Sequence, residues 1–181
     1  MTGHAWTTLD TPVGPLSVSC SRAGVNGVRF GKPPGQTPPA PGAPGAAAEL
    51  LSAAVTQLTG YFSGQLRRFD LPIDWSATSR LQQQVLRVLF DSVGYGETVS
   101  YGTLAQRAGS GDQGPSLPPR AIGQIMGSNP IPVIVPCHRV VAGNGLGGYS
   151  GGTGLEVKRW LLVFEGALPP TLDWAPTGPE A

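Results

Sequence analysis

The first part of the chain carries the alternation of apolar and polar residues that is typical of β-strands. Between residues 6 and 30, apolar side chains alternate with serines, stop at a turn containing glycine, and then resume. Because successive side chains of a strand point to opposite faces, this pattern predicts one or two antiparallel hairpins. From residue 47 to Gly64 the apolar residues recur every three or four positions, which predicts a helix. A short strand over residues 69–73 is expected to complete an N-terminal α/β unit.

The segment between these two patterns, residues 31–46, reads GKPPGQTPPAPGAPGA and has no apolar period. Segments of this composition do not nucleate regular structure, because proline lacks a backbone donor and glycine has no side chain to pack. We expect an exposed, semi-extended loop there.

The second part of the chain, residues 79–166, is richer in helix signals. Ser79, with Gln82 as its capping-box partner, and Ser100 each stand where an N-cap would precede an apolar helix. A third short helix is predicted over residues 119–127, because proline stands at its start and Asn-Pro follows its end. Two short helices joined by a loop favour a helix-turn-helix, although helix pairs are also common in proteins that bind no DNA.

An apolar run, IPVIV at residues 131–135, follows these helices. It is β-branched and too short for a helix, so it predicts a buried strand or extended segment that leads directly into PCHRV at residues 136–140. A glycine-rich stretch comes next at residues 142–152, and the last helix is predicted to start at Thr153 with Glu156 as its capping-box partner. The cysteine of PCHRV is therefore expected at the end of an apolar strand.

Composition and charge narrow the class of protein. The 181 residues are 40% hydrophobic and 13% charged, which suits one compact domain or one domain with a small annex. Twelve Lys and Arg against eleven Asp and Glu leave a net charge of +1, which excludes a strongly basic nucleic-acid coat but permits a local basic face. Residues 1–12 lack the pattern of a signal peptide, and no apolar run approaches the about 18 residues of a spanning helix. We expect no membrane segment, a cytoplasmic location by default, and a flexible tail over residues 167–181.

The chain has two cysteines in different contexts, Cys20 and Cys137. Two cysteines exclude a disulfide framework, and with two histidines they barely suffice for a zinc site, so we expect no metal and no cofactor. Cys20 lies on the apolar phase of a strand pattern, which indicates packing. Cys137 is followed by His138 and Arg139, and a nucleophilic cysteine needs such a base or positive field. Adjacent side chains need not face each other, so an inert buried cysteine beside a surface His and Arg remains the alternative.

Four blocks in the second part closely resemble the O6-alkylguanine-DNA alkyltransferases. They are the run from Arg120 to Asn129-Pro130, the run IVPCHRV at residues 134–140, GYSGG at residues 148–152, and the run from Lys158 to Glu165. The resemblance is strong over residues 81–166 and is only architectural before them. It implies an N-terminal α/β module, ribonuclease-H-like with an antiparallel sheet plus a helix, followed by a mainly α C-terminal domain with a helix-turn-helix.

This resemblance also implies a domain organisation and a function. The expected parts are an N-terminal α/β domain at 1–75, a DNA-binding and alkyl-transfer domain at 79–166 and the flexible tail. The family binds double-stranded DNA in the minor groove with low sequence specificity, flips an O6-alkylguanine out of the stack, and transfers its alkyl group irreversibly to a cysteine. It repairs O4-alkylthymine less efficiently. A monomer is implied, nucleoid-associated if the source is bacterial.

The resemblance also implies a role for each residue that matches a functional position of the family. Cys137 is the expected acceptor, His138 the base that takes its proton through water, and Glu165 the carboxylate that orients the imidazole, in the manner of a catalytic triad. Tyr101 matches the tyrosine that donates toward guanine N3, and Asn129 the residue that ties the DNA-binding helix to the cysteine loop. The implied DNA contacts and pocket residues are Ser100, Tyr101, Arg120, Ala121 and Gly123 for DNA, and Met126, Pro132, Val140, Gly148, Tyr149 and Ser150 for the alkylated base.

Arg120 matches the arginine that fills the gap left by the flipped base. The loop at residues 110–118 is longer and richer in Gly and Pro than the usual family connection, which leaves the presentation of Arg120 open. Two rival functions fit the sequence less well. A non-catalytic lesion-binding protein of the alkyltransferase-like kind would replace the cysteine that is present at Cys137, and a cysteine hydrolase would leave the spacing from the RAIG motif at Arg120 to PCHRV unexplained.

Overall fold

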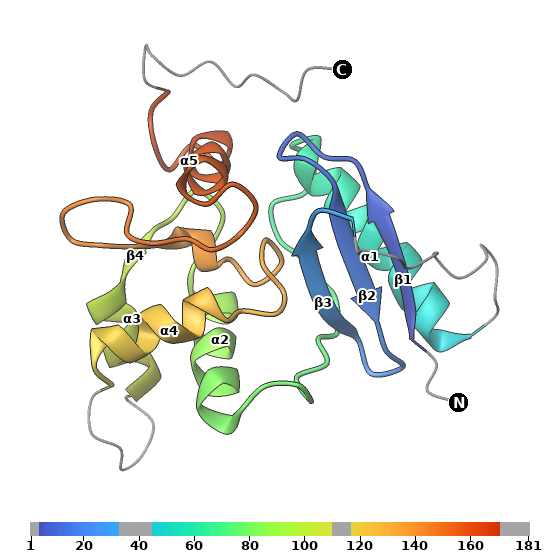
Figure 1. Ribbon diagram of the computed structural model, residues 1–181, viewed down its shortest axis with the longest axis horizontal. Helices are drawn as coiled ribbons and strands as arrows, with labels where there is room; N and C mark the ends of the chain where they lie inside the picture. Colours follow the sequence, from blue (N-terminus) through green and yellow to red (C-terminus); the bar gives the residue numbers. More distant parts are fainter. Residues whose placement is uncertain (1–3, 33–44, 110–116, 171–181) are drawn as a thin grey trace. The chain divides into compact units, whose positions relative to one another are not determined.

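The computed structural model describes residues 4–32, 45–109 and 117–170, and the chain divides into two compact units, one within residues 1–77 and one within residues 78–177 (Figure 1). Most of the proline-rich segment, most of the loop before Arg120 and the end of the C-terminal tail lie outside the described residues. None of the helices in the described ranges has the length and apolar character needed to cross a membrane.

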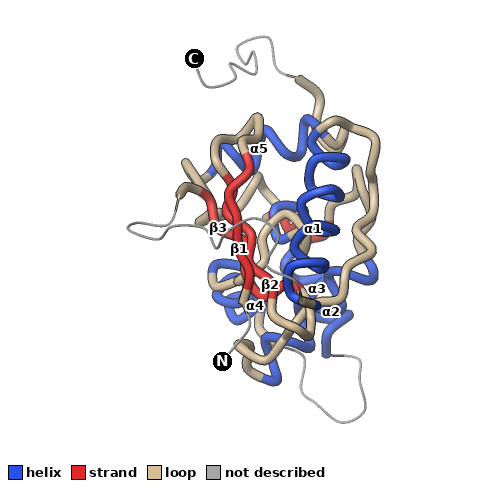
Figure 2. Tube along the Cα trace, turned by 90° about the vertical axis from the view of Figure 1, so that its right-hand side faces the viewer, coloured by secondary structure: helices blue, strands red, loops and turns tan. Residues whose placement is uncertain are grey.

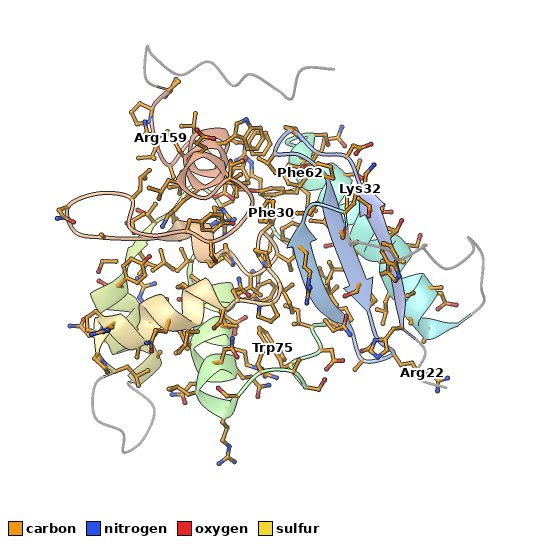
Figure 3. The ribbon with its side chains drawn as sticks, viewed as in Figure 1. Arg22, Phe30, Lys32, Phe62, Trp75 and Arg159 are labelled. Atoms are coloured by element: carbon orange, nitrogen blue, oxygen red, sulfur yellow. The ribbon has the colours of Figure 1, made fainter. Side chains whose placement is uncertain are left out.

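The first unit contains an antiparallel sheet and one long helix. Strands β1 (Ala5–Leu9), β2 (Leu16–Cys20) and β3 (Val25–Phe30) lie in the order β1-β2-β3, which confirms the predicted hairpins. Helix α1 (Ala46–Phe62) runs along one face of this sheet, as Figure 2 shows. Apolar side chains from the sheet and the helix form the core between them: Leu16, Val18, Cys20, Val28, Ala54, Leu58 and Tyr61. The turn between β2 and β3 carries Arg22, which projects beyond the end of the sheet (Figure 3).

The strand predicted over residues 69–73 is wrong. In the described chain this segment forms one isolated bridge, between Ile73 and Val25 of β3, and is otherwise irregular. Two hydrogen bonds hold it, from Val25 N–H to the Pro72 carbonyl and from Asp74 N–H to the Val25 carbonyl. The apolar pattern instead reflects burial of Phe69 and Leu71, which are each 7% exposed.

The second unit is mainly helical. Its elements are α2 (Arg80–Ser92), β4 (Val99–Ser100), α3 (Tyr101–Gly109), α4 (Pro119–Gly127), the 3-10 turn η1 (Cys137–Arg139), β5 (Val140–Val141) and α5 (Leu155–Phe164). Figure 1 shows α2, α3 and α4 grouped at one end of the unit and α5 at the other. The two short strands β4 and β5 pair in parallel, so that the start of α3 lies beside the chain that leaves η1. The bounds of α4 agree with the helix predicted over residues 119–127.

The helix starts were predicted with mixed success. The Ser79 side chain accepts from Gln82 N–H at 3.2 Å, and Ser100 Oγ accepts from Thr103 N–H at 3.0 Å. The capping box at Ser79 is half formed, because the Gln82 amide donates to the Ser128 carbonyl at 2.9 Å instead of returning to the N-cap. The capping box at Thr153 is wrong: α5 begins after Gly154, whose φ of 76° lets the chain turn into the helix without a side-chain cap.

Replacing Ser79 with alanine is expected to lower the free energy of unfolding by about 1 kcal/mol, because an N-terminal N–H of α2 loses its acceptor. Urea denaturation followed by circular dichroism measures the change. Ser52→Ala, at an exposed site inside α1, is the matched control and should leave stability unchanged or slightly higher. Equal effects of the two substitutions would show that the cap does not contribute.

Candidate active site

Cys137 is mounted on a buried turn rather than at the end of a strand. Residues 131–135 curl back on themselves, with Val135 N–H donating to the Ile131 carbonyl at 2.9 Å, so the predicted strand is wrong. Val133 has a φ of 73°, which a β-branched residue adopts at a cost in free energy. Asn129 brackets this turn, since its Oδ1 accepts from Ile131 N–H at 3.0 Å and its Nδ2 donates to the Val135 carbonyl at 2.9 Å. The Asn129 side chain therefore links the end of α4 to the turn that carries Cys137.

Cys137, His138 and Arg139 form one 3-10 turn in which all three side chains are buried. His138 is fully buried and Arg139 is 6% exposed, so the alternative that placed both on the surface is wrong. Consecutive side chains on a 3-10 turn point roughly 120° apart, because three residues complete each turn. In the described part of the chain, no direct hydrogen bond joins Cys137 to His138.

Glu165, at the C-terminal end of α5, pairs with His138 and Arg139, the two residues that follow the cysteine. Its Oε1 accepts from His138 Nε2 at 2.9 Å, and Arg139 donates to the same carboxylate from Nε at 2.9 Å and from a terminal nitrogen at 3.0 Å. Burial alone would raise the pKa of the Glu165 carboxyl, but the hydrogen bonds and charges of His138 and Arg139 outweigh it and lower the pKa to about 2. Glu165 is therefore ionised in this site at any physiological pH.

The ionised carboxylate fixes the state of the imidazole. Burial lowers the pKa of His138 below its ordinary value of 6.5, although the hydrogen bond and charge of Glu165 oppose this. A carboxylate can only accept, so Nε2 carries the proton and Nδ1 carries the free lone pair. Nδ1 is buried and has no hydrogen-bond partner among the described protein atoms. His138 can therefore accept a proton at Nδ1 while Glu165 holds the other side of the ring.

The Cys137 thiol is protonated in the unliganded protein. Burial raises its pKa above the ordinary value of 9.0, and the Asn129 hydrogen bond and the charge of Lys158 lower it only in part. A buried thiol of this kind is unreactive until its proton has an acceptor. The buried thiol therefore keeps its proton at neutral pH, and His138 Nδ1 in the same 3-10 turn has a free lone pair.

Beside Cys137 lies a pocket of about 540 Å³. It is lined by residues of α3, α4, η1 and the glycine-rich loop: Tyr101, Pro119, Gly123, Met126, Gly127, Cys137, Gly148, Tyr149 and Ser150. Of the residues expected to line the base pocket, Pro132 and Val140 are buried but are not among these. The pocket brings four predicted pocket residues together with the cysteine.

The predicted DNA-contact residues lie around the start of two helices. Ser100 caps α3, whose first residue is Tyr101, and Arg120 is exposed in the first turn of α4, followed by Ala121 and Gly123. Within the described ranges, no three His, Cys, Asp or Glu side chains gather into a cluster that could hold a metal ion.

Sequence reasoning missed the roles of Arg139 and Lys158. Lys158 and Glu165 lie on the buried stripe of α5 with Leu161 and Leu162, at helical spacings of three, four and seven. A charged residue on an apolar helix face is the signal that could have found Lys158. For Arg139, the signal was its place inside the apolar run that continues into Val140 and Val141.

Two family models match the chain and together span most of it. The model described as "6-O-methylguanine DNA methyltransferase, ribonuclease-like domain" matches residues 5–75. The model described as "6-O-methylguanine DNA methyltransferase, DNA binding domain" matches residues 80–167.

Curated relatives and solved structures agree with these models. A methylated-DNA–protein-cysteine methyltransferase of Mycobacterium tuberculosis is 38% identical over 90% of this chain and 93% of its own length. A DNA base-flipping protein of Thermus thermophilus is 40% identical over 88% of this chain and 99% of its own. The crystal structure of the Mycobacterium tuberculosis OGT in complex with DNA has a TM-score of 0.70 at 34% identity, and covers 90% of this chain and 93% of that one.

Proposed function

The chain belongs to the 6-O-methylguanine DNA methyltransferase family, and from this premise we propose that it repairs DNA by transferring the alkyl group of O6-alkylguanine to Cys137. Its activity is that of a methylated-DNA–protein-cysteine methyltransferase, which reverses the damage directly. The assignment of Cys137 as the alkyl acceptor is supported by its position on the pocket wall, next to a buried His138 that is hydrogen-bonded to Glu165. O4-alkylthymine is the second, less efficiently repaired substrate.

The reaction proceeds as an in-line displacement. The Cys137 proton passes through an intervening water to His138 Nδ1, and Glu165 stabilises the imidazolium that forms. The thiolate attacks the alkyl carbon, the bond from that carbon to O6 breaks, and the electron pair remains on guanine, which takes up a proton at N3. The product is a thioether on Cys137. Because thioethers are stable, each molecule repairs one lesion.

Tyr101 and Asn129 support this step in different ways. Tyr101 is the expected donor toward guanine N3, and its side chain lines the pocket, where its hydroxyl also donates to the Gly148 carbonyl of the glycine-rich loop at 3.4 Å. Asn129 fixes the turn before Cys137 and also lowers the pKa of the thiol through a hydrogen bond, against the larger effect of burial. Tyr101 is thus the source of the proton that guanine takes up at N3, whereas Asn129 acts on the thiol without taking part in bond formation.

The DNA-binding surface is assigned to α4, the second helix of the helix-turn-helix, which enters the minor groove. Among the described residues, a Cβ at Gly123 or Gly127 would meet no atom within 4 Å beyond the nearby backbone of its own helix, so packing against this part of the chain does not require glycine at either site. Close approach of a DNA backbone does favour glycine there. We assign residues 79–166 as the DNA-binding and transfer domain, residues 1–75 as the N-terminal domain and residues 167–181 as a tail, in a monomer with low sequence specificity.

Replacing Arg120 with alanine is expected to slow repair of a duplex lesion by more than about tenfold, since filling the gap offsets an unstacking cost of a few kcal/mol. The repair rate for the same lesion in a single strand should fall far less, because no gap in a base stack has to be filled. Single-turnover rates on both substrates measure the two effects. Arg107→Ala, on the exposed side of α3, is the matched control. An equal loss on duplex and single strand would contradict this role for Arg120.

The repair route is tested on the DNA itself. After incubation of the protein with a duplex that contains one O6-methylguanine, the nucleosides are released enzymatically and separated by chromatography. Direct reversal predicts that O6-methylguanine disappears, that guanine appears in equal amount, and that the strand stays intact. A free methylated base, an abasic site or an unchanged lesion would contradict the proposal.

A second candidate function is binding of the lesion without transfer. The similarity to the Thermus thermophilus DNA base-flipping protein favours it as an alternative. The presence of Cys137 on the pocket wall argues against it, because a pure lesion binder has no need of a thiol and a buried base there. The chromatographic test separates the two functions.

A further inference from the structure

Lys158 is a fully buried lysine in the second turn of α5. Burial lowers its pKa to about 8, partly opposed by Cys137, so the side chain is mostly charged at neutral pH. Within the described ranges the ammonium forms no ion pair with a carboxylate. A buried ammonium without a counter-ion costs free energy. Stability therefore does not explain the charge at this position.

One of the two hydrogen bonds of Lys158 reaches the wall segment, residues 147–150, which includes three of the pocket-lining residues. Its Nζ donates to the Val140 carbonyl at 2.6 Å and to the Gly148 carbonyl at 3.2 Å. The Tyr101 hydroxyl donates to the same Gly148 carbonyl at 3.4 Å. The ammonium thus joins the chain that leaves the 3-10 turn of Cys137 to the wall segment.

The wall segment is also attached at other points. A Cβ at Gly147 would lie 2.9 Å from the Tyr101 ring and 3.0 Å from its hydroxyl, so the backbone rests directly on that ring. Ser150 Oγ donates to the Gly127 carbonyl at the end of α4 at 3.0 Å. Ser150 is exposed, so water competes for its hydrogen bond to Gly127. The bond from Lys158 to the Gly148 carbonyl comes from a charged donor, and such hydrogen bonds are of the stronger kind.

We propose that Lys158 is a positioning residue that holds the wall segment against the pocket, by tying the Gly148 carbonyl to the Val140 carbonyl beside Cys137. This role rests on the proposed function, because the wall matters only if an alkylated base has to be held against the cysteine. Lys158 touches neither the base nor the alkyl group. Its effect is therefore on how well the base is placed, in addition to the effect of its charge on the thiol.

Two reagents separate the effect of Lys158 on placement of the alkylated base from the effect of its charge on the Cys137 thiol. Iodoacetamide alkylates Cys137 without needing a base pocket, whereas a duplex with one O6-methylguanine needs the wall. The readout is the ratio of the two second-order rates, measured by mass spectrometry of the Cys137 peptide. A change in thiolate population alters both rates and cancels in the ratio.

Lys158→Met, which keeps the length of the side chain but removes its donors, is expected to lower this ratio by at least about tenfold. Amide hydrogen exchange should become faster in residues 142–152 and stay unchanged in α1 and α2. Arg159→Met removes a charge from the next, exposed position of α5 (Figure 3) and is expected to leave the ratio unchanged. An unchanged ratio in Lys158→Met, or faster exchange throughout the chain, would overturn the proposal.

Gly147→Ala provides a second variant that keeps the lysine. Its Cβ would clash with Tyr101 at a φ of +70°, so it displaces the wall segment from the other side. It is expected to lower the same ratio with little effect on the iodoacetamide rate, and an unchanged ratio would count against the wall as the element that Lys158 holds. A wild-type protein that removes no methyl group would contradict the proposed function instead. Hydrogen exchange of residues 142–152 in Lys158→Met would then still decide whether Lys158 holds the loop.

Discussion

Replacing Glu165 with alanine is expected to lower the free energy of unfolding by about 3–5 kcal/mol and to reduce the rate of methyl transfer. The carboxylate is buried and accepts hydrogen bonds from both His138 and Arg139. Its removal leaves the Arg139 guanidinium buried without a counter-ion, which is the costly way to break a buried ion pair. Urea denaturation and single-turnover kinetics measure the two effects.

Glu156→Ala, on the exposed first turn of the same helix, is the matched control and should change stability by less than about 0.5 kcal/mol. Glu165→Gln keeps an acceptor for the imidazole while removing the charge. It should fold, and it should transfer the methyl group more slowly than the wild type, because the imidazolium is no longer stabilised. Wild-type rates in both Glu165 variants would contradict the assigned role.

Glu165 and His138 together determine how the stability of the protein depends on pH. The pKa of Glu165 is about 2 in the folded protein and 4.5 ordinarily, so its contribution is complete above pH 4.5 and is lost as the pH falls toward 2. His138 acts in the same direction, because burial lowers its pKa and the unfolded chain binds a proton first, near pH 6.5. Stability is therefore expected to fall in acid, with a shallower fall between pH 4.5 and 2 in Glu165→Gln.

Cys137→Ser is expected to abolish methyl transfer while leaving the affinity for the lesion within about twofold. A serine hydroxyl is a far weaker nucleophile than a thiolate at neutral pH, yet it has nearly the same size and leaves the pocket wall in place. Lesion binding by fluorescence anisotropy and repair by chromatography give the two readouts.

Cys20→Ala is the control for this prediction. Cys20 is fully buried in the sheet of the first unit, and burial raises its pKa to about 11, so it should play no part in transfer. Full repair by Cys20→Ala and none by Cys137→Ser is the expected pair of results. Residual repair by Cys137→Ser would mean that another group accepts the alkyl.

The sequence pattern predicted those elements whose conformation depends mainly on neighbouring residues. The alternation around β2 and the proline at the start of α4 predicted both elements, because side-chain direction and a preset φ depend on few neighbours. At residues 69–73 the alternating apolar residues resemble a strand in the sequence, but their side chains fill the core while the backbone forms no ladder of hydrogen bonds. Alternation reports which residues are buried, not which backbone groups pair.

The turn at residues 131–135 could not be predicted from its own residues. Its β-branched sequence favours a strand, whereas the chain forms a turn with a positive φ at Val133, and the Asn129 side chain bonds both ends of that turn. The family resemblance supplied the roles of His138 and Glu165, which lie 27 positions apart and meet only in the folded unit. Lys158 and Arg139 carried a sequence signal, a charge on an apolar stripe or run, that reasoning from motifs passed over.

One molecule is expected to take one alkyl group onto one cysteine. The decisive measurement is the intact mass of the wild-type protein after titration with a duplex that contains a single O6-methylguanine, followed by peptide mapping. We expect a gain of one methyl group per molecule, located on Cys137, with repair stopping when protein and lesion are equimolar. Repair of several lesions per molecule, or tight lesion binding with no gain in mass, would contradict it.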